Sequence, residues 1–186
     1  MLINNETIIK DDNPLIRQKS KDVELPLSDE NKQLLMDMLQ YVEDSTDEEK
    51  AVENNLRPAV GISAIQVGVP LKMTAVVIKD ENNETEYKYA LVNPKIISNS
   101  VEKAALCTGE GCLSVEGKHE GYVYRSARVK VRGYDILQDK EITIVAKDYL
   151  AIVLQHELDH FKGVLFYDYI SKDNPYYELD NSIIVE

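Results

Sequence analysis

The stretch 148–163 reads DYLAIVLQHELDHFKG, and its apolar residues spread almost all round the circumference of a helix. Asp148 can cap the start of this helix, which is predicted to run to about Lys162, where Gly163 is placed to end it. A helix that is apolar on nearly every side is expected to be buried. It also carries two histidines, a glutamate and an aspartate. Burying such groups is costly unless they are paired or bind a metal.

Five residues of this helix, His156 to His160, match the HExxH pattern. Residues four apart on an α-helix lie about 40° apart around its axis, so both imidazoles can reach one metal ion. Glu157 is one position on, close enough to touch a metal-bound water without binding the metal. A chance match to three fixed letters is the alternative, and the expected burial of the helix argues against it.

A metal held by two imidazoles needs at least one more protein ligand. No histidine follows His160, so the downstream candidate is Glu178, in a polar tail without a helical pattern. The upstream candidate is Cys112, whose thiolate is a good soft ligand for iron or zinc. Gly111 beside it permits a close approach of the backbone. The residues alone leave both candidates open.

Three segments together resemble the ordered motifs of the peptide deformylases: GISAIQ at 61–66, EGCLS at 110–114 and QHELDH at 155–160. Their order and rough spacing match the family across nearly the whole chain. The long insert before the first motif resembles the longer form of the family found in Gram-positive bacteria. The resemblance implies a hydrolase that removes the N-formyl group from N-formylmethionine of newly made polypeptides, releasing formate.

The resemblance also implies a role for each motif residue. One divalent metal ion is expected, Fe(II) in the cell, with zinc, nickel or cobalt possible in purified protein. Its expected ligands are Cys112, His156 and His160. Glu157 would take a proton from the metal-bound water and pass it to the leaving amine. The side-chain amide of Gln66 and the backbone N–H of Leu113 would donate hydrogen bonds to the developing oxyanion.

The first motif departs from the usual pattern of the family at three positions. Ala59 stands in place of a glycine, Ser63 in place of an alanine and Ile65 in place of a common proline, whereas Gly61 and Gln66 are kept. These changes are expected to affect the shape of the loop and its contacts with substrate rather than the chemistry.

Further residues near the motifs are candidates for binding the methionine side chain of the substrate. These are Gly61, Ile62 and Val153, with Ile152 as a weaker candidate because ordinary core packing explains it equally well. Val153 lies three residues before His156 and therefore shares its helix face.

Two charged residues, Glu110 and Arg125, are expected by resemblance to form a buried pair that braces the metal loop, although two unrelated surface charges are the alternative. Cys107 is predicted to be a small buried apolar residue. His119 lies in an exposed-looking loop, and neither of these two residues is given a role.

The remaining pattern predicts an α+β fold in which small, mostly antiparallel sheets surround the central HExxH helix. Ser28 is a good cap for an amphipathic N-terminal helix over 28–43. The acidic stretch 43–50 is expected to be a solvated loop or a frayed continuation of that helix. Alternating apolar residues predict two hairpins, with Pro94 ending the second strand of the first one. Their strands are expected at 73–78 and 87–92, and at 129–134 and 141–146.

Composition excludes several classes of protein. A chain of 186 residues with 44% apolar content can bury one core, which excludes disorder and fits a single domain, 1–186. A net charge of −12 disfavours DNA binding and limits any ribosome contact to a weak or local one. No apolar run could span a membrane, and the polar start does not resemble a signal peptide. Two cysteines make no disulfide framework, so a cytoplasmic location is expected.

Two other functions compete with the deformylase interpretation. One is a thermolysin-like zinc peptidase that uses Glu178 as its third ligand. The other is a closed structural zinc site, in which a residue such as Cys107 joins the cysteine and the two histidines and leaves no exchangeable water.

Overall fold

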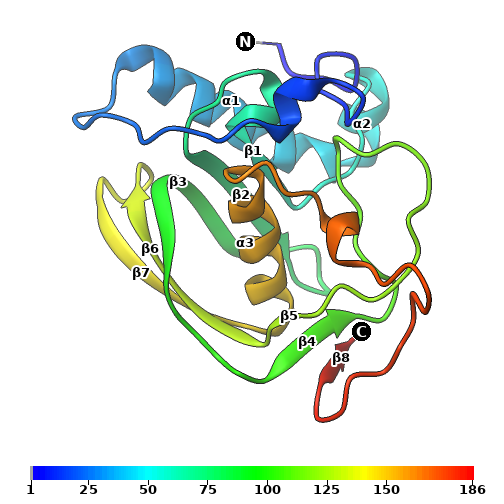
Figure 1. Cartoon of the computed structure of the whole chain (residues 1–186). Helices are drawn as coiled ribbons and strands as arrows, with labels where there is room; N and C mark the ends of the chain where they lie inside the picture. The colour runs from blue at the N-terminus through cyan, green and yellow to red at the C-terminus, as the bar shows by residue number, and fades with distance from the viewer. Residues whose placement is uncertain (1) are drawn as a thin grey trace.

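The helix α3 (Asp148–His160) lies at the centre of the molecule, with strands curving around it (Figure 1). The structure is a computed structural model that describes residues 2–186. Residues of α3 are buried from Leu150 to Gln155 and from Glu157 to His160, which confirms the predicted burial. The prediction that Asp148 caps the helix is wrong, because Lys147 occupies the cap position and Asp148 is already the first helical residue. The backbone N–H of Asp148 instead donates to the Ala127 carbonyl.

A five-stranded antiparallel sheet packs against α3. Its strands, in spatial order, are β1 (Gly61–Ser63), β2 (Met73–Lys79), β3 (Thr85–Asn99), β6 (Arg128–Asp135) and β7 (Lys140–Lys147). Side chains alternate between its two faces, as in any strand. On β2, Val76 and Ile78 join the core around α3, whereas Ala75 and Val77 join the core around the N-terminal helix. The sheet therefore separates two apolar layers.

The two predicted hairpins are confirmed as β2–β3 and β6–β7, but the predicted end of β3 is wrong. The strand continues through Pro94 to Asn99. Its pairing with β2 ends at Val92, and its register with β6 shifts between Val92 and Lys95. Proline has no backbone N–H to donate to a neighbouring strand. Because Pro94 lies where the β3–β6 pairing is irregular, the sheet does not need a hydrogen bond from this position.

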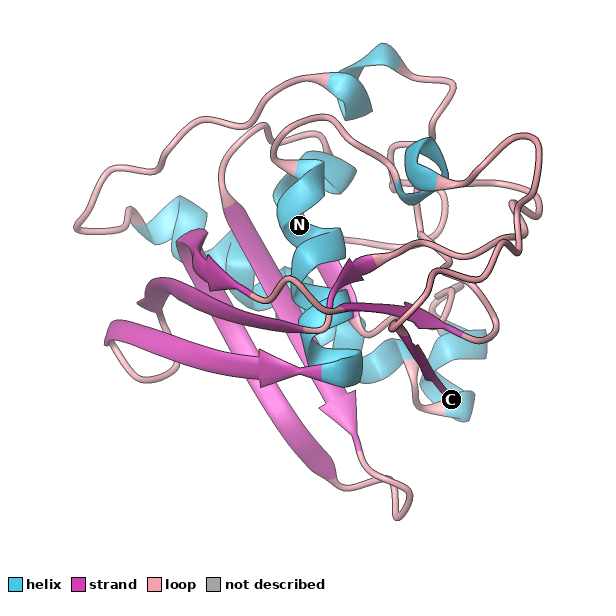
Figure 2. Cartoon of the chain, turned by 60° about the horizontal axis from the view of Figure 1, so that its bottom comes forward, coloured by secondary structure: helices cyan, strands magenta, loops and turns pink. Residues whose placement is uncertain are grey.

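A second, three-stranded sheet lies beside α3, where Ala104 of its central strand shares a small apolar cluster with Ile152 (Figure 2). Its central strand β4 (Lys103–Leu106) pairs antiparallel with β5 (Arg125–Ser126) and parallel with β8 (Ile183–Val185) near the end of the chain. These strands have two to four residues, too few for an alternating pattern to be recognised in the sequence. The fold is α+β with small, mostly antiparallel sheets, as predicted.

The N-terminal helix α1 (Asp29–Ser45) is confirmed, and the Ser28 hydroxyl accepts a hydrogen bond from the Asn31 N–H at its start. Of the two expectations for the acidic stretch after it, a continuation of the helix is the better one: α1 runs to Ser45, and a short helix α2 (Glu48–Glu53), which was not predicted, follows. The Asp47 side chain caps α2, and acidic residues in its first turn favour the helix through its dipole. Three 3-10 turns complete the fold: η1 (Pro14–Arg17), η2 (Ala64–Val67) and η3 (Phe166–Tyr169).

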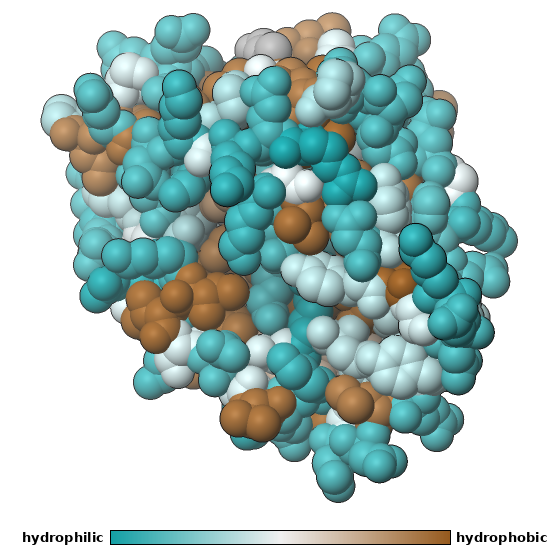
Figure 3. Space-filling model, in the orientation of Figure 1, coloured by the Kyte–Doolittle hydropathy of each residue, from teal (hydrophilic) through white to brown (hydrophobic). Residues whose placement is uncertain are grey.

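The face shown in Figure 3 is mainly hydrophilic, with apolar side chains in small, separate patches. Within residues 2–186, no helix combines the length and the apolar character needed to cross a bilayer.

Gly163 is expected to be intolerant of a side chain. It adopts φ +72°, and a Cβ there would overlap the carbonyl oxygen of Arg17. Gly163→Ala should therefore lower the free energy of unfolding by about 3 kcal/mol, measured by urea denaturation. Gly117 is the matched control, because it has φ +81° but open space around it. Gly117→Ala should cost only about 1 kcal/mol, and equal losses for the two variants would contradict the steric explanation.

Candidate active site

Three possible metal ligands converge between α3 and the loop that follows β4. The donor atoms of Cys112, His156 and His160 all lie within 4.8 Å of one another, and no other group of three such residues was found in residues 2–186. The Cys112 Sγ is 3.4 Å from the His160 Nε2. A thiolate with two imidazoles suits zinc or iron, and three protein ligands leave a coordination position for water. The donor set therefore fits a catalytic metal ion.

Burial and neighbouring charges set the protonation of the two histidines. Burial holds the pKa of His160 well below its ordinary range, so the imidazole is neutral and able to bind a metal. Burial also acts to lower the pKa of His156, but hydrogen bonds and charge from Cys112 and Glu110 outweigh it and raise that pKa well above its ordinary value. A metal ion would displace the proton that His156 then carries.

The alternative ligands do not join this cluster. Glu178 is exposed on the C-terminal tail, and it is absent from the group of possible ligands found in residues 2–186. Cys107 is exposed, so its predicted burial is wrong. It follows directly after β4, where its backbone N–H pairs with the Val185 carbonyl. The observed geometry therefore supports neither the Glu178 peptidase nor the closed zinc site with Cys107.

Glu110 and Arg125 form a buried ion pair, with Nε and Oε1 2.6 Å apart and both side chains almost fully buried. Arg125 also binds Asp159 on α3 at 2.8 Å, and Glu110 Oε2 lies 3.3 Å from His156 Nδ1. Burial acts to raise the pKa of Glu110, but hydrogen bonds from Arg125 and His156 outweigh it and lower the value to about 2. The sequence did not reveal Asp159 as the second partner of Arg125, because Asp159 occupies one of the two variable positions of the HExxH pattern.

Glu157 is buried beside β1, and its carboxylate lies between two residues of the first motif. Ser63 Oγ donates to Oε2 at 2.8 Å, while a Cβ added to Gly61 would lie 2.5 Å from Oε1. Glycine at 61 is therefore needed to leave room for the carboxylate. Burial raises the pKa of Glu157, as suits a group that accepts and returns a proton near neutral pH.

Gln66 is held with its amide nitrogen towards Cys112. Its Oε1 accepts from the Ser63 N–H at 2.9 Å, and its Nε2 donates to Ser114 Oγ at 3.1 Å and to Cys112 Sγ at 3.5 Å. The N–H of Leu113 makes no hydrogen bond within residues 2–186 and is free to donate to a ligand. The Lys10 ammonium binds the Leu113 carbonyl at 3.0 Å, a contact that no sequence motif indicated.

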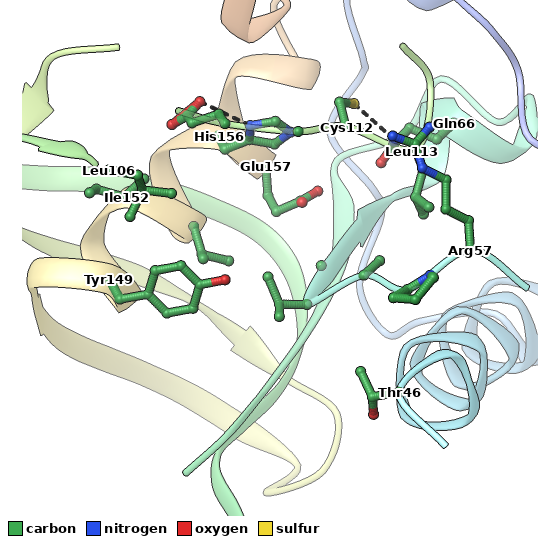
Figure 4. A pocket seen from close by; sticks show the side chains of 17 residues that line it. Thr46, Arg57, Gln66, Leu106, Cys112, Leu113, Tyr149, Ile152, His156 and Glu157 are labelled. Atoms are coloured by element: carbon green, nitrogen blue, oxygen red, sulfur yellow. Dashed lines mark hydrogen bonds and ion pairs between the residues drawn. The ribbon is translucent and has the colours of Figure 1, made fainter. Parts of the chain in front are cut away.

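These groups open onto a cavity of about 300 Å³ (Figure 4). Gly61, Ile152 and Val153 line it as predicted for the pocket, but Ile62 does not. Gly61 and Ser63 face α3, so Ile62, between them on β1, must face the α1 core instead, where it is fully buried. Val60 lines the cavity in its place.

Several other lining residues lie outside the motifs. The Tyr149 ring stands on the first turn of α3 with its hydroxyl towards the cavity, and Leu106 lies beside Ile152. Arg57, on the opposite side, donates from Nη1 to the Val115 carbonyl at 3.0 Å. Their sequence neighbourhoods carry no periodic or motif signal that points to a cavity, so only the tertiary structure reveals them.

A model of the family described as "Polypeptide deformylase" matches residues 5–175 of the chain. The chain belongs to the peptide deformylase family. It is 46% identical over 185 residues to Peptide deformylase 2 of Bacillus subtilis, with 100% of both chains covered. It is 44% identical to Peptide deformylase of Ligilactobacillus salivarius, again over 100% of both. This similarity to Gram-positive members agrees with the expected longer form.

Solved structures of peptide deformylases share the fold. The crystal structure of peptide deformylase from Ehrlichia chaffeensis in complex with actinonin superposes with a TM-score of 0.72 at 31% identity, over 93% of this chain and 91% of that one. A probable peptide deformylase from Synechococcus phage S-SSM7 gives a TM-score of 0.68 at 31% identity, over 88% and 98%.

In this family member, removing the Arg125 charge is expected to be strongly destabilising. Arg125→Met removes the guanidinium that binds two buried carboxylates and should lower the free energy of unfolding by about 3–5 kcal/mol, measured in metal-free protein. Arg128 is the matched control, since its side chain makes an exposed contact with Glu102 at 3.5 Å. Arg128→Met should cost less than about 1 kcal/mol. A loss that small for Arg125→Met would contradict the role of the buried pair.

Proposed function

We propose that Glu157, Gln66 and Leu113 carry out the reaction of this peptide deformylase. Family membership makes the chain a metal-dependent hydrolase that removes the N-formyl group from nascent peptides. One observation carries the assignment of residues: the buried Glu157 lines the same cavity as Cys112 and His156, two members of the three-donor cluster. We assign Cys112, His156 and His160 as the metal ligands, which is the set that the convergence of their donor atoms supports.

The residues divide the reaction between proton transfer and charge stabilisation. A bound divalent metal ion supplies an acidified water and polarises the formyl carbonyl. Glu157 accepts the proton of the attacking water and returns it to the leaving amine, so formate and a free α-amine result. The Gln66 amide and the Leu113 N–H donate to the oxygen that gains negative charge.

Fe(II) is the proposed ion in the cell. A Cys/His/His set also accepts zinc, nickel or cobalt, so the ion in purified protein depends on its availability. Thiolate-bound Fe(II) makes the site sensitive to oxygen. The proposed setting is the cytoplasm, where formylated nascent peptides arise. The net charge of −12 limits any contact with the ribosome to a weak or local one.

Val60, Ile152 and Val153 are proposed to contact the methionine side chain. They present an apolar wall of the cavity close to Glu157 and to the metal ligands. Gly61 contributes space and a close approach of the backbone rather than a side chain. An unbranched, flexible thioether is suited to such an irregular apolar wall.

The decisive test is formate release from a formyl-Met-Ala-Ser peptide by protein purified without oxygen. Wild type should be active, whereas Glu157→Gln should keep its metal and lose at least about 100-fold in kcat, because it cannot accept the proton. Metal content is measured on both proteins. A fully metallated wild type that releases no formate would reject the proposed function.

The ligand assignment is tested by metal content alone. Cys112→Ala should lose most of its bound metal after dialysis, because it removes one of only three protein ligands. Glu178→Ala should retain the wild-type stoichiometry, since Glu178 is exposed and outside the cluster. The reverse pattern would favour the zinc peptidase.

A further inference from the structure

The Ser63 hydroxyl is the one side chain in residues 2–186 that donates a hydrogen bond to the Glu157 carboxylate. Ser63 ends β1, is fully buried and stands where the family usually has an alanine. Its Oγ lies 2.8 Å from Glu157 Oε2, 3.0 Å from the Glu157 carbonyl oxygen and 3.4 Å from Thr74 Oγ1. These contacts join the first motif directly to the HExxH helix.

A serine hydroxyl has a single proton to donate, so these three acceptors compete for it. The carboxylate oxygen is the nearest and carries charge, and a charge-assisted bond is about twice as strong as a neutral one. Thr74 Oγ1 is the most distant acceptor, and its own proton goes to the Ile62 carbonyl at 2.9 Å. The Ser63 proton is therefore directed to Oε2.

The other carboxylate oxygen is left without a protein donor. Glu157 Oε1 accepts no hydrogen bond from residues 2–186 and lies over the α-carbon of Gly61, at the wall of the cavity. The two oxygens of one carboxylate thus have different surroundings: Oε2 is occupied by Ser63, and Oε1 is open towards the place where substrate and water must bind.

We propose that Ser63 is a positioning residue that holds Glu157 by Oε2 and so reserves Oε1 for proton transfer. The terminal torsion of a glutamate side chain is broad, so without a donor the carboxylate would rotate and exchange its oxygens. Fixing that torsion keeps the accepting oxygen within reach of the water and the amine, and such orientation contributes to rate. The inference rests on the proposed role of Glu157 as the proton carrier.

Alanine isolates the effect of the hydroxyl. The Ser63 backbone N–H, which orients Gln66 through Oε1, is kept in Ser63→Ala, whereas the hydroxyl contacts with Glu157 and the longer one with Thr74 are lost. Thr74→Val is the matched control: it removes the neighbouring buried hydroxyl, which bonds the Ile62 carbonyl but does not contact the carboxylate. Both variants remove one buried hydroxyl group, and the two hydroxyls lie on adjacent strands.

The experiment measures kcat and KM for formyl-Met-Ala-Ser, metal content and melting temperature for wild type, both variants and Glu157→Gln. Ser63→Ala should lower kcat about tenfold at unchanged KM and unchanged metal content, as expected for the loss of one hydrogen bond to a charged group. Thr74→Val should lower the melting temperature about as much as Ser63→Ala does, but it should keep kcat within about twofold of wild type.

A wild-type kcat in Ser63→Ala would overturn this inference and leave the proposed function standing. An equal loss of kcat in Thr74→Val would also overturn it, because general loosening of β1 against β2 would then explain both results. A raised KM at unchanged kcat would assign the hydroxyl to substrate binding instead. Inactive wild type, or full activity in Glu157→Gln, would reject the proposed function itself and this inference with it.

Discussion

The burial of α3 is the constraint on which the rest of the structure depends. Five of the six residues from Gln155 to His160 are polar, and they lie along a helix packed on several sides. Each needs a partner to offset the loss of water. Each of the five has a partner on another segment of the chain. The pairs are Gln155 with the Ser126 backbone, His156 with Glu110, Glu157 with Ser63, Asp159 with Arg125, and His160 with Cys112.

These pairs both stabilise the fold and position the proposed catalytic groups. Ser63 belongs to β1, Ser126 and Arg125 to β5, and Glu110 and Cys112 to the loop after β4. Satisfying the polar side of α3 therefore brings the three motif segments together at one end of the cavity. Arg125 has the central place in this arrangement, because its guanidinium joins the metal loop to the helix through two buried carboxylates.

Sequence patterns predicted the elements that are long and regular. The alternation in β2, β6 and β7 and the helical spacing in α1 and α3 reflect one-sided or complete burial, and they gave the α+β class. The patterns gave wrong predictions where contacts between distant segments determine the end of a strand or the direction of a side chain. Pro94 did not end β3, since its position in an irregular part of the ladder removes the need for an N–H. Ile62 faces the α1 core, because Gly61 and Ser63 on either side of it face α3.

By itself, the sequence determined the central helix, its HExxH residues and, through three ordered motifs, the family of the protein. Those are local facts, since spacing along a helix and along the chain fixes them. Only the tertiary structure decided that Cys112 rather than Glu178 lies beside the histidines, that Arg57 and Tyr149 line the cavity, and that the Ser63 hydroxyl reaches Glu157. Such contacts join residues up to 94 positions apart, and their distances depend on how the sheets close around α3.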